Sequence, residues 1–176
     1  AIALIIDDGL RECIDLAFLR LKKIGVNWLS EHTVAPHVTL CSGVVKSTDD
    51  LSQAVKKIAA SNSAFSVTSQ GLGVFITQTP VVHIRWLPSG PLRLLREKCY
   101  LETKDVWEKI DRYSGTAYWE PKTTIAIKDT SNANLSKALI SVEDINFTQE
   151  VVFKEISLIE VIDNYEFTRE AHRFLA

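Results

Sequence analysis

The sequence predicts an α+β fold made of two related halves, with antiparallel sheets forming a central cleft and helices on the outer faces. The main observation is a near-repeat, since the segment 36–40 (PHVTL) returns 85 positions later as 121–125 (PKTTI). A helix-like segment follows each copy, and each helix-like segment then gives way to one that opens on phenylalanine. These segments are 48–55 and 132–139, then those beginning at Phe65 and Phe147. We therefore expect one bilobal domain over residues 1–176, with its motifs at 36–40 and 121–125.

The first half begins with a continuous apolar run over residues 2–6, which predicts a central strand. Asp8 can cap a helix over about 10–23, because apolar residues then recur at helical spacing. Gly25 is a typical helix stop. The motif strand and its helix follow, and residues 65–77 and 81–86 predict two strands of a hairpin broken at 78–80.

The second half opens with Pro91, which is well placed to start a long helix that we expect to reach about Lys109. A loop at 113–116 leads to the second motif strand and its helix. Strands over 147–154 and 156–162 and a closing strand near Arg173 complete the repeat.

Each motif carries a polar pair on a strand. Residues two apart share one face of a strand, so His37 lies beside Thr39 and Lys122 beside Thr124. If the two halves face one another, both pairs converge on one cleft. That geometry suits a phosphate.

The paired motifs, with tryptophan, an acidic residue and proline at 119–121, resemble the two-histidine phosphoesterase superfamily. Its members include RNA 2′,3′-cyclic phosphodiesterases, also called 2′-5′ RNA ligases. The resemblance extends over essentially the whole chain. The first His-x-Thr motif matches fully, whereas the second has Lys122 in place of histidine.

The resemblance implies that two acid/base groups exchange protons across a phosphodiester while the hydroxyls bind phosphate oxygens. Carried over by match, His37 and Lys122 are the catalytic pair, and Thr39 and Thr124 bind the phosphate. Lysine has a reference pKa of about 10.4, so Lys122 can donate a proton but is a poor base near neutral pH. Two outcomes stay open: a directional enzyme with His37 as base and Lys122 as acid, or a weakened protein that mainly binds.

Several other residues are candidates for the site, and most of the candidates also have a purely structural explanation. Arg85 is a candidate second cation for the substrate phosphate, and His83 on the same strand could replace the missing imidazole. Tyr113, Tyr118 and Trp119 could stack on a base, although core packing explains them equally well. Without the motifs, His37 would be read as structural, Lys122 as an edge-strand lysine and the threonines as ordinary strand residues.

The composition and charge of the chain limit the classes of ligand that it can bind. The chain is 46% apolar with a formal net charge of −2, which argues against tight binding to long duplex nucleic acid but allows a local basic cleft. Three cysteines without ligand spacing indicate reduced thiols, and no run is long enough for a membrane span. We expect a monomer in the cytoplasm that needs no metal or other cofactor and acts on a small nucleotide or RNA terminus.

The leading functional prediction is a metal-independent hydrolase acting on a 2′,3′-cyclic phosphate or a 2′-5′ linkage. A noncatalytic protein that binds nucleotides or RNA ends is the alternative, favoured by Lys122. A protein-interaction domain on the same fold is a third reading, since fold does not dictate function.

Overall fold

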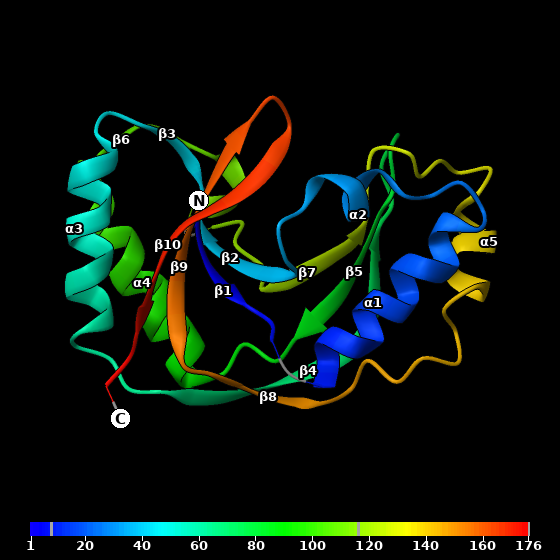
Figure 1. The fold of residues 1–176 in the computed structure, drawn as a ribbon, viewed down its shortest axis with the longest axis horizontal. Helices are drawn as coiled ribbons and strands as arrows, with labels where there is room; N and C mark the ends of the chain where they lie inside the picture. Colours follow the sequence, from blue (N-terminus) through cyan, green and yellow to red (C-terminus); the bar gives the residue numbers. More distant parts are fainter. Residues whose placement is uncertain (8, 116, 176) are drawn as a thin grey trace.

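Two four-stranded antiparallel sheets form the framework of the computed structural model, which describes residues 1–7, 9–115 and 117–175 (Figure 1). The first sheet has the order β10-β9-β1-β2, with the bounds Tyr165–Arg173, Glu155–Ile162, Ile2–Ile5 and His37–Cys41. The second has the order β7-β5-β4-β8, with the bounds Lys122–Ala126, Val81–Trp86, Phe65–Phe75 and Glu150–Phe153. The motif strand β2 is an edge strand of the first sheet, and the motif strand β7 is an edge strand of the second. The two strands lie side by side where the sheets meet (Figure 1).

Helices flank the sheets on both sides, as the sequence predicts (Figure 1). Helix α3 (Thr48–Ala59) packs against β9 and β10, and α4 (Gly90–Thr103) packs against α3 and β2. On the other side lie α1 (Gly9–Lys22) and the short α5 (Leu135–Ile140), of which α1 contacts β7. The α+β class and the cleft-forming antiparallel sheets are therefore confirmed.

Local sequence explains most of these elements. The apolar run of β1 is buried, and α1 buries Leu10, Ile14, Ala17 and Leu21 at helical spacing. The hydroxyl of Ser47 caps α3 by accepting the N–H of Asp50 at 3.2 Å. Asp8, the predicted cap of α1, lies outside the described residues.

One element departs from the prediction, because α4 ends at Thr103 instead of continuing to about Lys109. Residues Trp107–Ile110 form strand β6, which pairs with β3 (Gly43–Val45). The Trp107 side chain is buried, and its indole N–H donates to the Thr103 hydroxyl at 2.9 Å. Tertiary pairing with β3 therefore outweighs the helical pattern of this segment.

Several other elements differ from the prediction; for example, β4 ends at Phe75 and not at 77. The second motif helix begins at Leu135 and not at 132, and β8 begins at Glu150 and not at Phe147. The side chain of Phe147 is still buried, so its apolar character reflects the core and not a strand. A short helix before the first motif, α2 (Trp28–His32), was not anticipated. Within the described residues, none of the helices combines the length and the apolar character needed to cross a membrane.

The β3–β6 pairing yields a stability prediction at Gly43. A Cβ atom at this position would overlap the carbonyl oxygen of Lys109 and lie 2.9 Å from the Cα of Ile110, both in the backbone of the partner strand. Gly43→Ala should lower the free energy of unfolding by about 1–3 kcal/mol, measured by denaturant titration. Gly90→Ala is the control, since nothing lies within 4 Å of the position its methyl group would take, and it should change stability by less than about 0.5 kcal/mol. Equal stability of the two variants would contradict the close approach.

Candidate functional site

Strands β2 and β7 have the same alternation of buried and accessible residues. Val38 and Leu40 of β2 are buried, as are Thr123 and Ile125 of β7. The alternate residues are His37 and Thr39 on β2 and Lys122 and Thr124 on β7, and all four line one cavity. The two motifs therefore present their polar pairs to a shared space.

This cavity has a volume of about 280 Å³. Besides the four motif residues it is lined by Trp28, Leu29, Thr33, Pro36, Ile127, Lys128 and Glu166. Two larger cavities, of about 380 and 490 Å³, lie elsewhere and contain none of the four polar motif residues. The chemistry, not the size, identifies the 280 Å³ cavity as the candidate site, which we call the motif cavity.

The ring of His37 is oriented by the backbone just before its strand. Its Nδ1 lies 2.8 Å from the carbonyl oxygen of Ala35. A carbonyl can only accept, so Nδ1 carries the proton and the neutral ring keeps its lone pair on Nε2. No described residue hydrogen-bonds to Nε2, which leaves this atom as a base.

The carboxylate of Glu166 lies near the Nδ1 atom of the His37 ring. Oε2 of Glu166 lies 3.9 Å from Nδ1 of His37 and accepts a hydrogen bond of 2.5 Å from the hydroxyl of Thr33. Glu166 belongs to β10, at the far edge of the first sheet from β2 in strand order. The carboxylate of Glu166 is therefore the acidic group beside the His37 ring.

Lys122 faces the same cavity from β7. Burial lowers the pKa of its ammonium, and the nearby carboxylate of Glu120 offsets part of this effect. The ammonium also lies 5.8 Å from the centre of the Phe75 ring. A lysine with a lowered pKa is a better proton donor than an exposed one while it remains a cation.

The two motif hydroxyls are available to a ligand. Neither Oγ1 of Thr39 nor that of Thr124 has a hydrogen-bond partner among the described residues. The other face of β7 differs, because the hydroxyl of the buried Thr123 accepts the indole N–H of Trp86 at 3.0 Å. Thr123 is therefore structural, while Thr39 and Thr124 are free to donate to an anion.

Arg85 and His83 lie on β5, next to β7. Arg85 pairs directly with Lys122 and His83 with Thr124, so their side chains share the face of β7 that carries the motif pair. Arg85 is exposed but does not line the motif cavity. His83 is buried and stacks on Phe75 at 4.3 Å, and burial lowers its pKa. His83 is therefore poorly placed to replace the missing imidazole.

The three aromatic residues before the second motif do not line the motif cavity. The indole N–H of Trp119 donates to the carbonyl of Thr39 at 2.9 Å, and the guanidinium of Arg96 lies 5.6 Å from its ring. Tyr118 is exposed and packs with Arg112, and Tyr113 is exposed. The positions of these three residues give no support to the predicted base stacking, because all of them lie outside the lining of the motif cavity. Trp119 instead joins the segment before β7 to strand β2.

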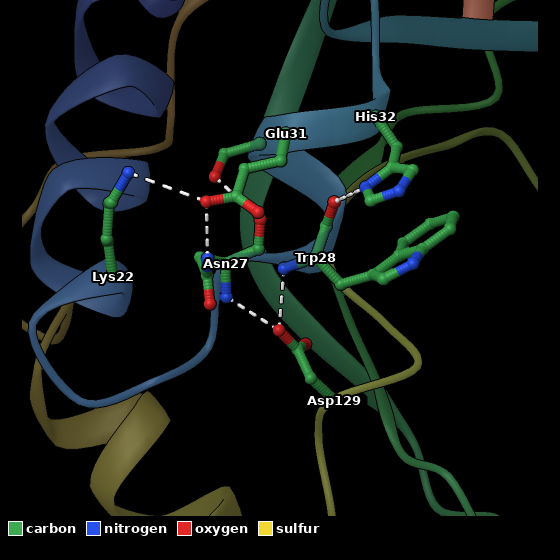
Figure 2. A network of polar contacts seen from close by, with 7 residues as sticks. Lys22, Asn27, Trp28, Glu31, His32 and Asp129 are labelled. Atoms are coloured by element: carbon green, nitrogen blue, oxygen red, sulfur yellow. Dashed lines mark hydrogen bonds and ion pairs between the residues drawn. The ribbon is translucent and has the colours of Figure 1, made fainter. Parts of the chain in front are cut away.

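Trp28, Lys128 and Glu166 line the cavity but were missed by the sequence reasoning. No local pattern marks them, since they lie outside both motifs, in a short helix, in the loop just after β7 and in β10. Figure 2 shows what holds two of them in place: a carboxylate oxygen of Asp129 accepts the backbone N–H groups of Asn27 and Trp28, both at 2.6 Å. The loop after the second motif is thereby tied to the helix before the first.

The described residues contain no cluster of three or more histidine, cysteine or acidic side chains that could hold a metal ion. The groups that face the cavity are instead one imidazole, two ammonium groups, one carboxylate and two free hydroxyls. Such a set can bind an anion, accept a proton at one end and donate a proton at the other.

Comparison with solved structures shows the same fold in several proteins. TT0787 of Thermus thermophilus aligns with a TM-score of 0.68 and 15% identity, covering 98% of this chain and 96% of that one. LigT of E. coli, solved with 3′-AMP, aligns with a TM-score of 0.65 and 14% identity over 99% and 98%. A protein described as a phosphoesterase aligns with a TM-score of 0.64 and 15% identity over 99% and 97%. Identities this low show the fold alone.

Curated protein sequences give no significant match. The family model described as the 2′-5′ RNA ligase superfamily, in contrast, matches residues 30–164, which include both motifs and most of the chain. The chain therefore belongs to the 2′-5′ RNA ligase superfamily of two-histidine phosphoesterases.

Proposed function

We propose that the protein binds a phosphodiester of a small nucleotide or RNA end in the motif cavity and hydrolyses it, with a 2′,3′-cyclic phosphate or a 2′-5′ linkage as the target. One observation carries this proposal: His37, Thr39, Lys122 and Thr124 line one cavity from two facing strands. Family membership supports a phosphoesterase, and the acid/base pair defines the direction of the reaction.

His37 acts as the base in this scheme. Its Nε2 takes a proton from water as the water oxygen bonds to phosphorus, and Glu166 stabilises the resulting imidazolium. Lys122 acts as the acid and gives its proton to the ribose oxygen as the bond from that oxygen to phosphorus breaks. Solvent then removes a proton from His37 and returns one to Lys122, so the cycle closes without a cofactor.

Binding and charge stabilisation complete the scheme. Thr39 and Thr124 donate hydrogen bonds to the nonbridging oxygens, and Lys122 stabilises the negative charge of the transition state. The bound phosphate opposes the effect of burial on Lys122 and favours its charged form. A noncatalytic nucleotide- or RNA-end-binding protein is the second candidate, because a partly buried ammonium can hold the anion without exchanging protons.

The first prediction concerns turnover. His37→Ala should reduce kcat/KM for nucleoside 2′,3′-cyclic phosphates, or for 2′-5′ linked oligonucleotides, by at least about 10²-fold, because the general base is lost. Product is measured by chromatography. His172→Ala is the matched control, since this histidine binds Glu170 and does not line the cavity. Wild-type protein that forms no more product than His37→Ala would argue against catalysis and for the binding role.

A second prediction concerns the departure from the family motif. Lys122→Met should lower turnover by about 10²- to 10⁴-fold, since it removes the proton donor and keeps most of the apolar stem. Lys122→His should retain activity, because imidazole can also donate a proton near neutral pH. Steady-state kinetics measure both variants. A Met variant as active as the wild type would show that Lys122 is not the acid.

The lowered pKa of Lys122 gives a third prediction, on ligand binding. The charged ammonium attracts the phosphate, so affinity is full below the pKa of the free protein and falls as pH rises through it. Binding of a nucleoside 3′-phosphate, measured by calorimetry from about pH 8 to about pH 10, should weaken before an ordinary lysine titrates at about 10.4.

Lys122→Arg should remove this alkaline loss of affinity, because a guanidinium stays charged across the range. Lys154→Arg, on a residue outside the motif cavity, should keep the wild-type profile. An identical decline in all three proteins would assign the titration to another group.

A further inference from the structure

A second cavity, of about 490 Å³, is lined by the segment directly before β7. This segment is 119–121, and helix α4 contributes Arg93, Arg96 and Glu97 to the same lining. We call this space the arginine cavity. It shares no lining residue with the motif cavity, so a ligand bound in it is held apart from the proposed reaction.

Arg96 carries a buried positive charge that no acidic side chain balances. The residue is 5% exposed, and within the described part of the chain it forms no ion pair. A guanidinium does not lose its proton in a protein, so burial cannot neutralise it. An isolated buried charge is unfavourable, and a bound anion would supply the missing countercharge.

Most N–H groups of this guanidinium also lack an acceptor. Its one hydrogen bond runs from Nη2 to the backbone carbonyl of Ser114. Nε is enclosed and has no partner among the described residues. Nη1 has no partner either but, unlike Nε, keeps some accessible surface. Since Arg96 lines the arginine cavity, a ligand there can accept from Nη1 and from the second N–H of Nη2.

Aromatic rings orient the guanidinium without using its donors. Its central carbon lies 5.2 Å from the centre of the Tyr100 ring and 5.6 Å from the centre of the Trp119 ring. Both contacts are within the range of cation–π attraction. They hold the planar group in place and leave the N–H groups at its edge free. A carboxylate is planar and accepts two parallel N–H bonds, so it matches such an edge.

The other charged residues of the lining limit the charge of the ligand. Arg93, three residues before Arg96 on α4, is exposed and its side chain has no polar partner among the described residues. Two neighbouring cations on one helix repel each other unless an anion lies between them. Glu97 and Glu120 are also exposed, and neither pairs with an arginine in the described structure. Because these two carboxylates repel a dianion more strongly than a monoanion, the lining favours a single negative charge.

The remaining lining is apolar. Pro88, Pro121 and the Trp119 ring contribute it. The volume of about 490 Å³ falls within the range of about 300–1,000 Å³ that is typical of sites for small molecules. A ligand that fills this space therefore has an apolar part beside its charged group.

We propose that the arginine cavity binds a small organic monocarboxylate, with the carboxylate at Arg96 and the apolar part against Trp119 and the two prolines. Arg93 approaches the same carboxylate from the surface. The ligand is bound and not chemically changed. This inference is independent of the proposed function, because the two cavities have no lining residue in common.

Four six-carbon probes test the charge of the ligand: hexanoate, hexan-1-ol, hexylamine and adipate. The indole N–H signals of the four tryptophans in ¹⁵N-labelled protein report where each probe binds. Trp119 lines the arginine cavity and Trp28 the motif cavity, and Phe variants of both assign their signals. Hexanoate should shift the Trp119 signal saturably and leave that of Trp28 unchanged. Its Kd should be at least about tenfold lower than those of hexanol and hexylamine, and adipate should bind no more tightly than hexanoate.

Three variants test the residues. Arg96→Met removes the donors and the charge and should raise the Kd of hexanoate by at least about tenfold. Arg93→Gln changes an exposed side chain and should raise it by about two- to fivefold. Arg173→Gln is the matched control, because this exposed arginine of β10 lies outside the cavity, and it should keep the wild-type Kd. The probe comparison in the wild type and Arg93→Gln decide the matter if Arg96→Met does not fold.

Each other outcome would overturn the inference. A shift of the Trp28 signal in place of the Trp119 signal would put the carboxylate in the motif cavity. Hexanol binding as tightly as hexanoate would show an apolar pocket without a carboxylate site, and tighter binding of adipate would show a site for a dianion. If no probe shifts the Trp119 signal, Arg96 serves only to hold Ser114 and the two rings.

Discussion

The meeting of two edge strands is the constraint on which the site depends. Because side chains alternate along β2 and β7, each strand buries one face in the core and turns the other toward the shared cavity. The same pleat therefore anchors Val38 and Ile125 and presents His37 and Lys122. A shift of one residue in either strand would exchange these faces, so core packing and site chemistry are specified together.

Contacts between the halves keep the two strands in place. The indole of Trp119, just before β7, donates to the backbone of Thr39 in β2. On the other side of the site, Asp129 just after β7 binds the backbone of the helix that precedes β2 (Figure 2). Both ties join the flank of one motif to the other half of the molecule. These contacts to backbone groups hold the strands that carry His37 and Lys122 in place relative to one another.

The two motif strands present different ionisable groups, an imidazole on β2 and an ammonium on β7, so the two ends of the cavity differ chemically. At one end His37 is oriented by a carbonyl and backed by a carboxylate, an arrangement that favours taking a proton. At the other end Lys122 is a partly desolvated cation, an arrangement that favours giving one. Under the proposed function, this difference is what gives the reaction one preferred direction.

The sequence by itself determined three things: the two motif strands, the placing of His37 with Thr39 and of Lys122 with Thr124 on one strand face, and the α+β class. Each of these follows from the alternation or the helical spacing of residues that are close together in the chain. Only the tertiary structure decided the end of α4 at Thr103, where pairing of β6 with β3 outweighs the helical pattern. It also decided the places of Glu166 and Lys128 at the cavity and of Trp119 outside its lining. These positions depend on contacts between segments far apart in the chain, which no local periodicity encodes.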